Sequence, residues 1–312
     1  MSSRNELLQR IEELSSTIDQ QKEILRNLET SRSDACMALN ALSDPVARLP
    51  VEVASNVFTL CLPDDQVYPQ PGPQTAPLLL LRVCRIWRDI VLSSPSLWAT
   101  VHFDLRAQDS SQFAPGVAAW LGRTRDAPLN LHLSGSISDA ITKVIEQHAP
   151  QMQTLKLRIW FNEGQLLEYV APFASLRVLR LFGTRGITIS ECLQYLDSAP
   201  RLDELGIGSD YLPTGDPTPV LHTSLRTLQL WEESDCCPSL ILQYLTLPAL
   251  ENLVISQSCG TDGNVSGFLA RSSPPRLRIH IGGERKLQHF GLVPGLSAIT
   301  VQCTHFEGGR FI

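Results

Sequence analysis

Seven histidines and eight cysteines are the side chains of this sequence best suited to nucleophilic, acid–base or metal chemistry. Their spacing does not match what such chemistry requires. No G-x-S-x-G segment presents a serine nucleophile, and no C-x-x-C pair signals zinc or redox chemistry. His102, His132 and His280 each stand alone in strand-like segments, where surface or hydrogen-bonded histidines outnumber catalytic ones. We therefore expect no enzymatic activity, no bound metal and no cofactor.

A second group of side chains is suited to binding. Cationic and aromatic residues, and in one case an amide, recur two positions apart in short apolar segments, as Lys156 with Arg158, Arg180 with Phe182, and Gln229 with Trp231. Aromatic rings flanked by guanidinium groups are enriched at the energetic centres of protein interfaces. These six residues are the predicted target-binding residues, and we expect the target to carry an acidic patch.

Charge and hydropathy exclude several other classes of protein. The net charge of -6 and the pI of 5.7 are far from the basic range of nucleic-acid-binding domains. No apolar run is long enough to span a bilayer, and the N-terminus lacks the layout of a secretory signal. We expect no nucleic-acid or membrane partner, and a cytoplasmic or nuclear location. Most cysteines should be small buried residues rather than disulfide partners.

The candidate binding residues belong to a repeated pattern. Segments such as MQTLKLR, SLRVLRLFG, SLRTLQLWE and ALENLVIS share apolar residues at positions i, i+3 and i+5. Their last apolar positions recur at intervals of 20 to 26 residues, a period typical of leucine-rich repeats. These positions are Leu133, Leu157, Leu181, Ile207, Leu230, Ile255, Ile281 and Val301.

Amphipathic helical patterns separate the strand-like segments. They include ISDAITKVIEQHA, EGQLLEYVAPF, SECLQYLDSAP and CPSLILQYLTLP, with Ser190 as an expected N-cap and Pro238 in a first turn. Strand followed by helix at this period predicts a parallel sheet with helices on one side. The polar residue that regularises strong repeats is missing, since Trp160, Thr184, Asp210, Glu233 and Ser258 occupy its place. We expect an irregular leucine-rich-repeat-like solenoid, with an ordinary α/β domain as the alternative fold.

Strand geometry predicts where the binding residues point. Side chains alternate between the two faces of a strand, so residues four and six positions into each repeat should lie on the exposed face. The three pairs occupy these positions. Alternatively, the N-terminal helix or a loop covers Phe182 and Trp231.

The N-terminal segment has a coiled-coil pattern. Apolar residues follow alternating steps of three and four, with Gln21 interrupting the seam; they are Leu7, Ile11, Leu14, Ile18, Leu25 and Leu28. Leu8 and Ile24 widen the apolar face. The pattern is compatible with a homodimeric coiled coil and with a helix that packs on its own protein.

Two short apolar helical patterns follow, divided by a loop that contains five prolines. Residues 47–63 (ARLPVEVASNVFTLCLP) place Pro50 in a first turn and Glu52 near the positive end of the helix dipole. Residues 78–98 (LLLLRVCRIWRDIVLSSPSLW) predict two further short helices. Three small helices bury only a modest core, so apolar surface should stay exposed unless a partner or the rest of the chain covers it.

The order LP-x-E, VF-x-x-CL, LLRVCRIWRDI and P-S-LW resembles the F-box domain, in particular the F-box-like proteins of mushroom-forming fungi. The resemblance covers about a fifth of the chain, and the proline-rich loop is longer than in the minimal motif. It implies a helical module that binds a Skp-family adaptor and, through it, a cullin-based (SCF-type) ubiquitin ligase.

The resemblance also implies an adaptor-binding surface. Its residues would be Leu49, Pro50, Val53, Val57, Phe58, Leu81, Val83, Cys84 and Trp87. Leu49 and Pro50 are expected at the interface. Val57, Phe58 and Trp87 could instead form the core of so small a module, and Trp87 is the natural centre of it.

Three regions are therefore expected: an amphipathic helix over residues 1–42, an F-box-like domain over 43–105, and a leucine-rich-repeat-like recognition domain over 106–312. The predicted function is that of a non-catalytic substrate-recognition adaptor of a ubiquitin ligase. The alternative is a free-standing leucine-rich-repeat interaction or scaffold protein without ligase association.

Overall fold

The computed structural model describes residues 2–63, 70–105, 110–159, 172–182, 188–209, 217–232, 238–256, 263–282 and 299–304. The chain forms two compact units. The first, here called the helical unit, comprises Met1–Pro63 and Gly72–Leu97. The second, here called the sheet unit, comprises Asp64–Pro71 and Trp98–Ile312.

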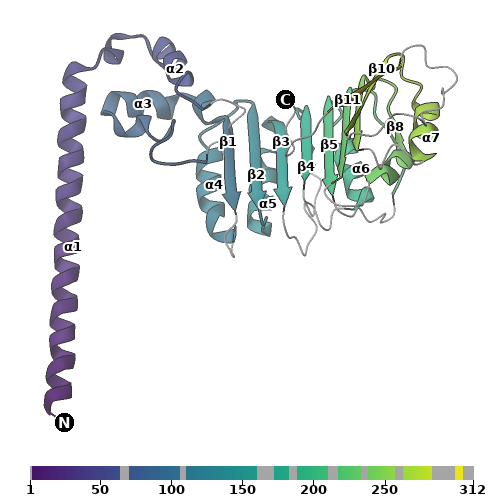
Figure 1. Cartoon of the computed structure of the whole chain (residues 1–312). Helices are drawn as coiled ribbons and strands as arrows, with labels where there is room; N and C mark the ends of the chain where they lie inside the picture. The colour runs from purple at the N-terminus through teal and green to yellow at the C-terminus, as the bar shows by residue number, and fades with distance from the viewer. Residues whose placement is uncertain are drawn as a thin grey trace. The chain divides into compact units, whose positions relative to one another are not determined.

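The helical unit begins with one long helix followed by short ones (Figure 1). These are α1 (Ser2–Ser43), η1 (Val46–Arg48), α2 (Val51–Thr59), η2 (Leu80–Arg82), α3 (Arg85–Ser93) and η3 (Pro95–Trp98), whose last residue belongs to the sheet unit. Pro50 directly precedes α2, where a missing backbone N–H costs nothing, and Glu52 lies in its first turn. The helix pattern expected on either side of the proline-rich loop is thus present, although η2 is a single 3-10 turn.

Nine parallel strands form the main sheet of the sheet unit, in the order β1-β2-β3-β4-β5-β7-β9-β10-β11 (Figure 1). They are β1 (Thr100–Leu105), β2 (Leu129–Gly135), β3 (Met152–Ile159), β4 (Val178–Phe182), β5 (Glu204–Ser209), β7 (Thr227–Glu232), β9 (Asn252–Ser256), β10 (Leu277–Gly282) and β11 (Ile299–Thr304). Two short strands, β6 (Val220–Leu221) and β8 (Leu245–Thr246), form a second small sheet.

The predicted apolar positions lie side by side across this sheet. One row in register contains Leu133, Leu157, Leu181, Ile207, Leu230, Ile255 and Ile281. The first six are buried. Val301 does not belong to this row, because its partner on β10 is Ile279 and Cys303 pairs with Ile281. The prediction from spacing alone was therefore wrong, and Cys303 takes the place of Val301 in the row. The interval from Ile281 to Cys303 is also closer to the other intervals.

Helices α4 (Ala114–Leu121), α5 (Asp139–His148), α6 (Ile189–Ser198) and α7 (Gly263–Ser272) and the 3-10 segments η4 (Ser110–Phe113), η5 (Ala149–Gln151) and η6 (Pro238–Tyr244) connect the strands. Helices α4, α5 and α6 lie behind the strands in Figure 1, on one side of the sheet. Their apolar faces are buried, for example through Ile141, Ile145, Leu193 and Leu196. The strand–helix alternation therefore buries one face of the sheet.

The N-cap of α6 differs from the prediction. Thr188, not Ser190, caps the helix: its hydroxyl accepts a hydrogen bond from the Glu191 backbone N–H at 3.1 Å, and Glu191 accepts one from the Thr188 N–H at 2.7 Å. This reciprocal pair is a capping box, which satisfies two backbone donors rather than one. The EGQLLEYVAPF helix pattern and the positions Trp160, Thr184, Asp210, Glu233 and Ser258 lie largely or wholly outside the described residues.

The expected α/β fold with a parallel sheet is confirmed. The boundary between the units differs from the prediction, since the helical unit ends at Leu97 and residues 100–105 form the first strand of the sheet. Of the helices in the described ranges, none is both long and apolar enough to cross a membrane. The same ranges contain no group of three or more His, Cys, Asp or Glu side chains that could hold a metal ion.

Candidate interaction surfaces

The face of the main sheet opposite helices α4, α5 and α6, here called the open face, brings together most of the predicted target-binding residues. Lys156 on β3 pairs with Arg180 on β4, and Arg158 pairs with Phe182 in the next outward row. Phe182 and Trp231 are each partners of Gly208, on the strand between them. Because parallel strands in register align their side chains, residues from four strands form one continuous surface. Gln229 is the exception among the six predicted target-binding residues, because its side chain is buried.

Two glycines on β5 allow the aromatic rings to meet. The rings of Phe182 and Trp231 lie 4.8 Å apart between centroids with an interplanar angle of 34°. A Cβ atom on Gly206 would approach Cζ3 of Trp231 to 2.6 Å and Cγ of Arg180 to 3.2 Å. The indole therefore lies across the backbone of Gly206, in space that any side chain would fill. Both aromatic residues stay half-buried rather than fully exposed.

Charge pairing and burial divide the remaining face residues. Arg180 forms a half-buried ion pair with Glu204 at 2.5 Å, which also constrains its guanidinium. Arg158 is exposed. Gln229 is only 5% exposed, and its Oε1 has no hydrogen-bond partner among the described residues. The expectation that Gln229 contacts a target therefore needs correction, because this side chain is buried.

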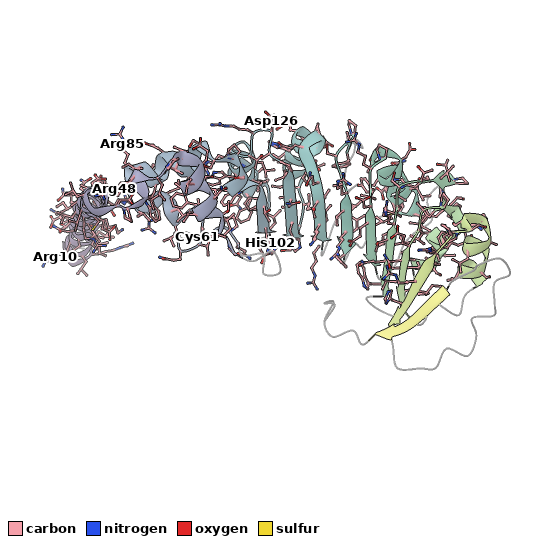
Figure 2. The ribbon with its side chains drawn as sticks, turned by 90° about the horizontal axis from the view of Figure 1, so that it is seen from above. Arg10, Arg48, Cys61, Arg85, His102 and Asp126 are labelled. Atoms are coloured by element: carbon pink, nitrogen blue, oxygen red, sulfur yellow. The ribbon has the colours of Figure 1, made fainter. Side chains whose placement is uncertain are left out.

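Two histidines extend this face, and single-residue reasoning from the sequence missed them. His102 on β1 and His132 on β2 are register partners whose rings stack 4.2 Å apart at an interplanar angle of 16°. The Nε2 atom of His102 hydrogen-bonds the Ser134 hydroxyl at 2.9 Å. Figure 2, a view from above, shows His102 on the opposite side of the sheet from Asp126. Alternation along each strand could have assigned both histidines to this face, but their stacking depends on the register of β1 and β2.

One row in register contains His102, His132, Lys156 and Arg180, of which Lys156 and Arg180 carry positive charges. Burial above all, together with the charges of His102, Lys156 and Arg158, lowers the pKa of His132 from 6.5 to about 3. Three neighbouring groups thus oppose a proton at this position. The same positive potential favours an anionic group of a ligand.

The depressed pKa makes the stability of the sheet unit depend on pH. Below pH 6.5 the unfolded chain binds a proton at His132 that the folded chain refuses until about pH 3. The free energy of unfolding should therefore fall as the pH is lowered through this window. The slope from one such group is at most about 1.4 kcal/mol per pH unit, a limit that partial exposure reduces.

We expect His132→Asn to flatten this dependence between pH 6.5 and 5, above the range in which most carboxylates titrate. Urea unfolding followed by circular dichroism at half-unit pH steps would measure it. The difference between the two proteins at pH 7 to 8 serves as the internal reference. Parallel profiles for the two proteins at all pH values would contradict the assignment.

The helical unit presents a second candidate surface on α2. Val53 and Val57, one turn apart, expose 45% and 41% of their area, and Leu49 and Pro50 before the helix are also exposed. On the adjoining side of the same helix, Ala54 and Phe58 are buried. A helix that is apolar on both its covered and its uncovered sides is typical of one that a partner encloses.

A small aromatic cluster holds α2 and α3 together. The rings of Phe58 and Trp87 lie 4.7 Å apart between centroids. The Trp87 Nε1–H donates a hydrogen bond to Oδ2 of Asp44 at 2.7 Å, and the Cys84 thiol lies 3.6 Å from the same oxygen. Asp44 therefore fixes both the indole and the start of α3 to the end of α1.

This cluster changes the assignment of two predicted adaptor-binding residues. Phe58 is 1% exposed and Cys84 is fully buried, so both belong to the core of the helical unit and are not available to a partner. Trp87 is half-buried and engaged with Asp44 and Phe58, in line with the alternative that it centres the core. Leu81 and Val83 are also half-buried, which leaves Leu49, Pro50, Val53 and Val57 as the exposed set.

No protein-family model matches this chain, and no curated protein matches it significantly.

Proposed function

We propose that the protein is a non-catalytic recognition adaptor, in which the helical unit binds a Skp-family adaptor of a cullin-based ubiquitin ligase and the sheet unit binds the target. In this proposal the helical unit is an F-box-like module and the sheet unit a degenerate leucine-rich-repeat array. The observation that carries the proposal is the division of α2 into a buried side, Ala54 and Phe58, and an exposed apolar side, Val53 and Val57.

The exposed side has the properties of a docking surface. Leu49, Val51, Val53 and Val57 expose between 40% and 51% of their area within the ten residues 49–58, which also include the buried core positions. A unit of this size gains little by leaving so much apolar area in water. A helical adaptor that covers these residues would remove that cost.

The open face of the sheet supports the second half of the proposal. Lys156 and Arg158, which oppose protonation of His132, lie on this face with the Arg180–Glu204 ion pair and the Phe182–Trp231 pair. This combination suits a target segment with a carboxylate or another anionic group next to an apolar side chain. Aromatic and arginine side chains commonly dominate such contacts.

The first arm of the test uses the full chain co-expressed with a Skp-family adaptor. Val53→Asp together with Val57→Asp should reduce adaptor capture by about 30-fold or more, since loss of one hot-spot contact costs about 2 kcal/mol. Asn56→Asp is the control, because it adds one carboxylate at an exposed polar position of the same helix. That control should retain capture.

A native chain that fails to capture the adaptor would overturn the ligase half of the proposal and favour the free-standing interaction protein.

The second arm of the test uses the proteins that accumulate when this chain is removed from its cell. A chain carrying Arg158→Ala, Arg180→Ala and Trp231→Ala should still bind the adaptor and should fail to restore their turnover. Restored turnover would exclude the open face as the target site.

A further inference from the structure

Helix α1 carries an apolar stripe along its whole length. Leu7, Ile11, Leu14, Ile18, Leu25 and Leu28 each expose more than half of their area. The alternating steps of three and four continue to Leu39 and Leu42, which are also exposed, so the stripe extends beyond the four heptads first evident in the sequence. Nothing described in the helical unit covers it.

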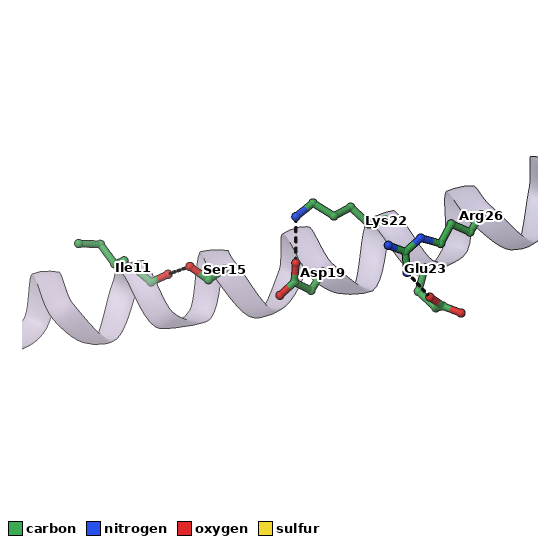
Figure 3. A network of polar contacts seen from close by, with 6 residues as sticks. All are labelled: Ile11, Ser15, Asp19, Lys22, Glu23 and Arg26. Atoms are coloured by element: carbon green, nitrogen blue, oxygen red, sulfur yellow. Dashed lines mark hydrogen bonds and ion pairs between the residues drawn. The ribbon is translucent and has the colours of Figure 1, made fainter. Parts of the chain in front are cut away.

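Polar contacts on α1 lie away from this stripe. Asp19 pairs with Lys22 at 3.1 Å and Glu23 with Arg26 at 3.2 Å, all with exposed side chains (Figure 3). Ser15 donates a hydrogen bond to the Ile11 carbonyl at 2.8 Å. Exposed pairs of this kind contribute only a few tenths of a kcal/mol each. They cannot by themselves stabilise an isolated helix of 42 residues, whose apolar face needs a partner.

The period of the stripe indicates what kind of surface covers it. Its repeat is seven residues, whereas a straight α-helix returns to the same face every 3.6 residues and drifts by about 20° per heptad. From Leu7 to Leu42 a straight stripe would thus rotate by roughly 100°, away from any flat surface. A second helix that supercoils around α1 follows the stripe along its full length of roughly 60 Å.

The residues in the seam indicate the orientation. Ile11 and Ile18 alternate with Leu7 and Leu14, the β-branched and γ-branched arrangement that favours two parallel strands. Gln21 and Arg32 interrupt the seam. In a parallel pair in register each meets its own counterpart, so the two Gln21 amides can hydrogen-bond across the seam. The two Arg32 guanidinium groups must then extend out of the seam on their long stems.

We propose that α1 pairs with α1 of a second copy of this chain as a parallel, in-register, two-stranded coiled coil. The particle then carries two helical units and two sheet units. This pairing does not depend on the proposed function. Where that function holds, two linked sheet units would bind a target with two sites more tightly than one, because the second contact becomes intramolecular.

The oligomeric state of the full chain tests the pairing. Light scattering after gel filtration should give twice the protomer mass of 34.5 kDa. Ile11→Lys with Ile18→Lys should give the protomer mass, because two charged layers replace two apolar ones. Glu12→Lys with Ser16→Lys, two positions off the stripe, should remain dimeric. A native chain at the protomer mass, a higher oligomer, or a dimer that survives the seam substitutions would overturn the proposal.

Cysteine cross-linking tests the orientation. Gln21→Cys should form an interchain disulfide on mild oxidation, because in-register pairing brings the two positions together across the seam. The exposed thiols of Cys36 and Cys61 are first replaced by serine. Ser16→Cys in the same background, on the outer side of the helix, should not cross-link. Cross-linking at position 16 but not at position 21 would contradict the parallel pairing.

A dimer in which neither position cross-links would point to an antiparallel pair or a different interface and would also overturn the proposal. Capture of the Skp-family adaptor by the Ile11→Lys, Ile18→Lys chain separates the two hypotheses. The monomeric variant should still bind the adaptor if the proposed function is right, whatever the outcome for the coiled coil.

Discussion

Phe58→Ala is expected to lower the free energy of unfolding of the helical unit by about 3 to 5 kcal/mol, the usual cost of removing a buried phenylalanine side chain. Phe58 is 1% exposed and packs against Trp87 at 4.7 Å between ring centroids. The unit has few other large buried side chains with which to refill the space, so the neighbours cannot collapse far into the cavity. Amide hydrogen exchange of peptides from α2 and α3, measured in the full chain, reports the local loss.

Val57→Ala is the matched control for this prediction. It removes an apolar side chain from the adjacent position of the same helix, but Val57 is already 41% exposed, so the expected loss is below about 1 kcal/mol. Adaptor capture should show the opposite order, with the larger effect from Val57 when the unit stays folded. Equal protection of the α2 and α3 amides from hydrogen exchange in the two variants would mean that Phe58 does not belong to the core.

Gly206→Ala is expected to destabilise the sheet unit by about 1 to 3 kcal/mol, the range typical of overpacking a filled space. The new Cβ would lie 2.6 Å from Cζ3 of Trp231, closer than carbon atoms can approach, so the indole must move. Its displacement should separate it from Phe182 and disturb Arg180, whose Cγ would lie 3.2 Å from the same Cβ. Urea unfolding of the full chain measures the loss.

Gly116→Ala is the control for the same chemical change. A Cβ at Gly116 has nothing within 4 Å, and the residue lies inside α4, where alanine is favoured over glycine by up to about 1 kcal/mol. This variant should be neutral or more stable. In a Trp231→Ala background the Gly206→Ala change should cost little, since the obstructing ring is gone. A full cost in that background would place the strain elsewhere.

The sheet was the most predictable part of the fold. Its apolar residues recur with a fixed offset inside each repeat, and burial of one face requires this, so spacing alone aligned Leu133, Leu157 and Leu181 as the structure does. The alignment failed at Val301, where the interval shortens. Val301 and Cys303 both fit the apolar pattern of this strand, and Cys303 is the residue that pairs with Ile281. Periodicity predicts which residues of a strand share a face. It does not predict which of two such residues pairs with a given residue of the neighbouring strand.

The candidate sites were less predictable, for a different reason. Alternation along a strand assigned Arg158, Phe182 and Trp231 to the outer face, but the burial of Gln229 depends on the side chains of neighbouring strands. The stacked pair His102 and His132 joins residues thirty positions apart, a relation that only the register reveals. Likewise, Phe58 and Val57 are consecutive apolar residues, and tertiary packing alone decides which one faces the core.

The order of the strands has a consequence for how this protein could change. Along the main sheet each strand pairs with the next long strand of the chain, so most contacts of an outward side chain are with the strands on either side, and the large rings of Phe182 and Trp231 reach across one strand to each other. A substitution on β1 therefore leaves the far strands and their contacts intact. Substitutions could therefore change the ligand specificity of the open face strand by strand, while the buried rows behind it keep the sheet folded.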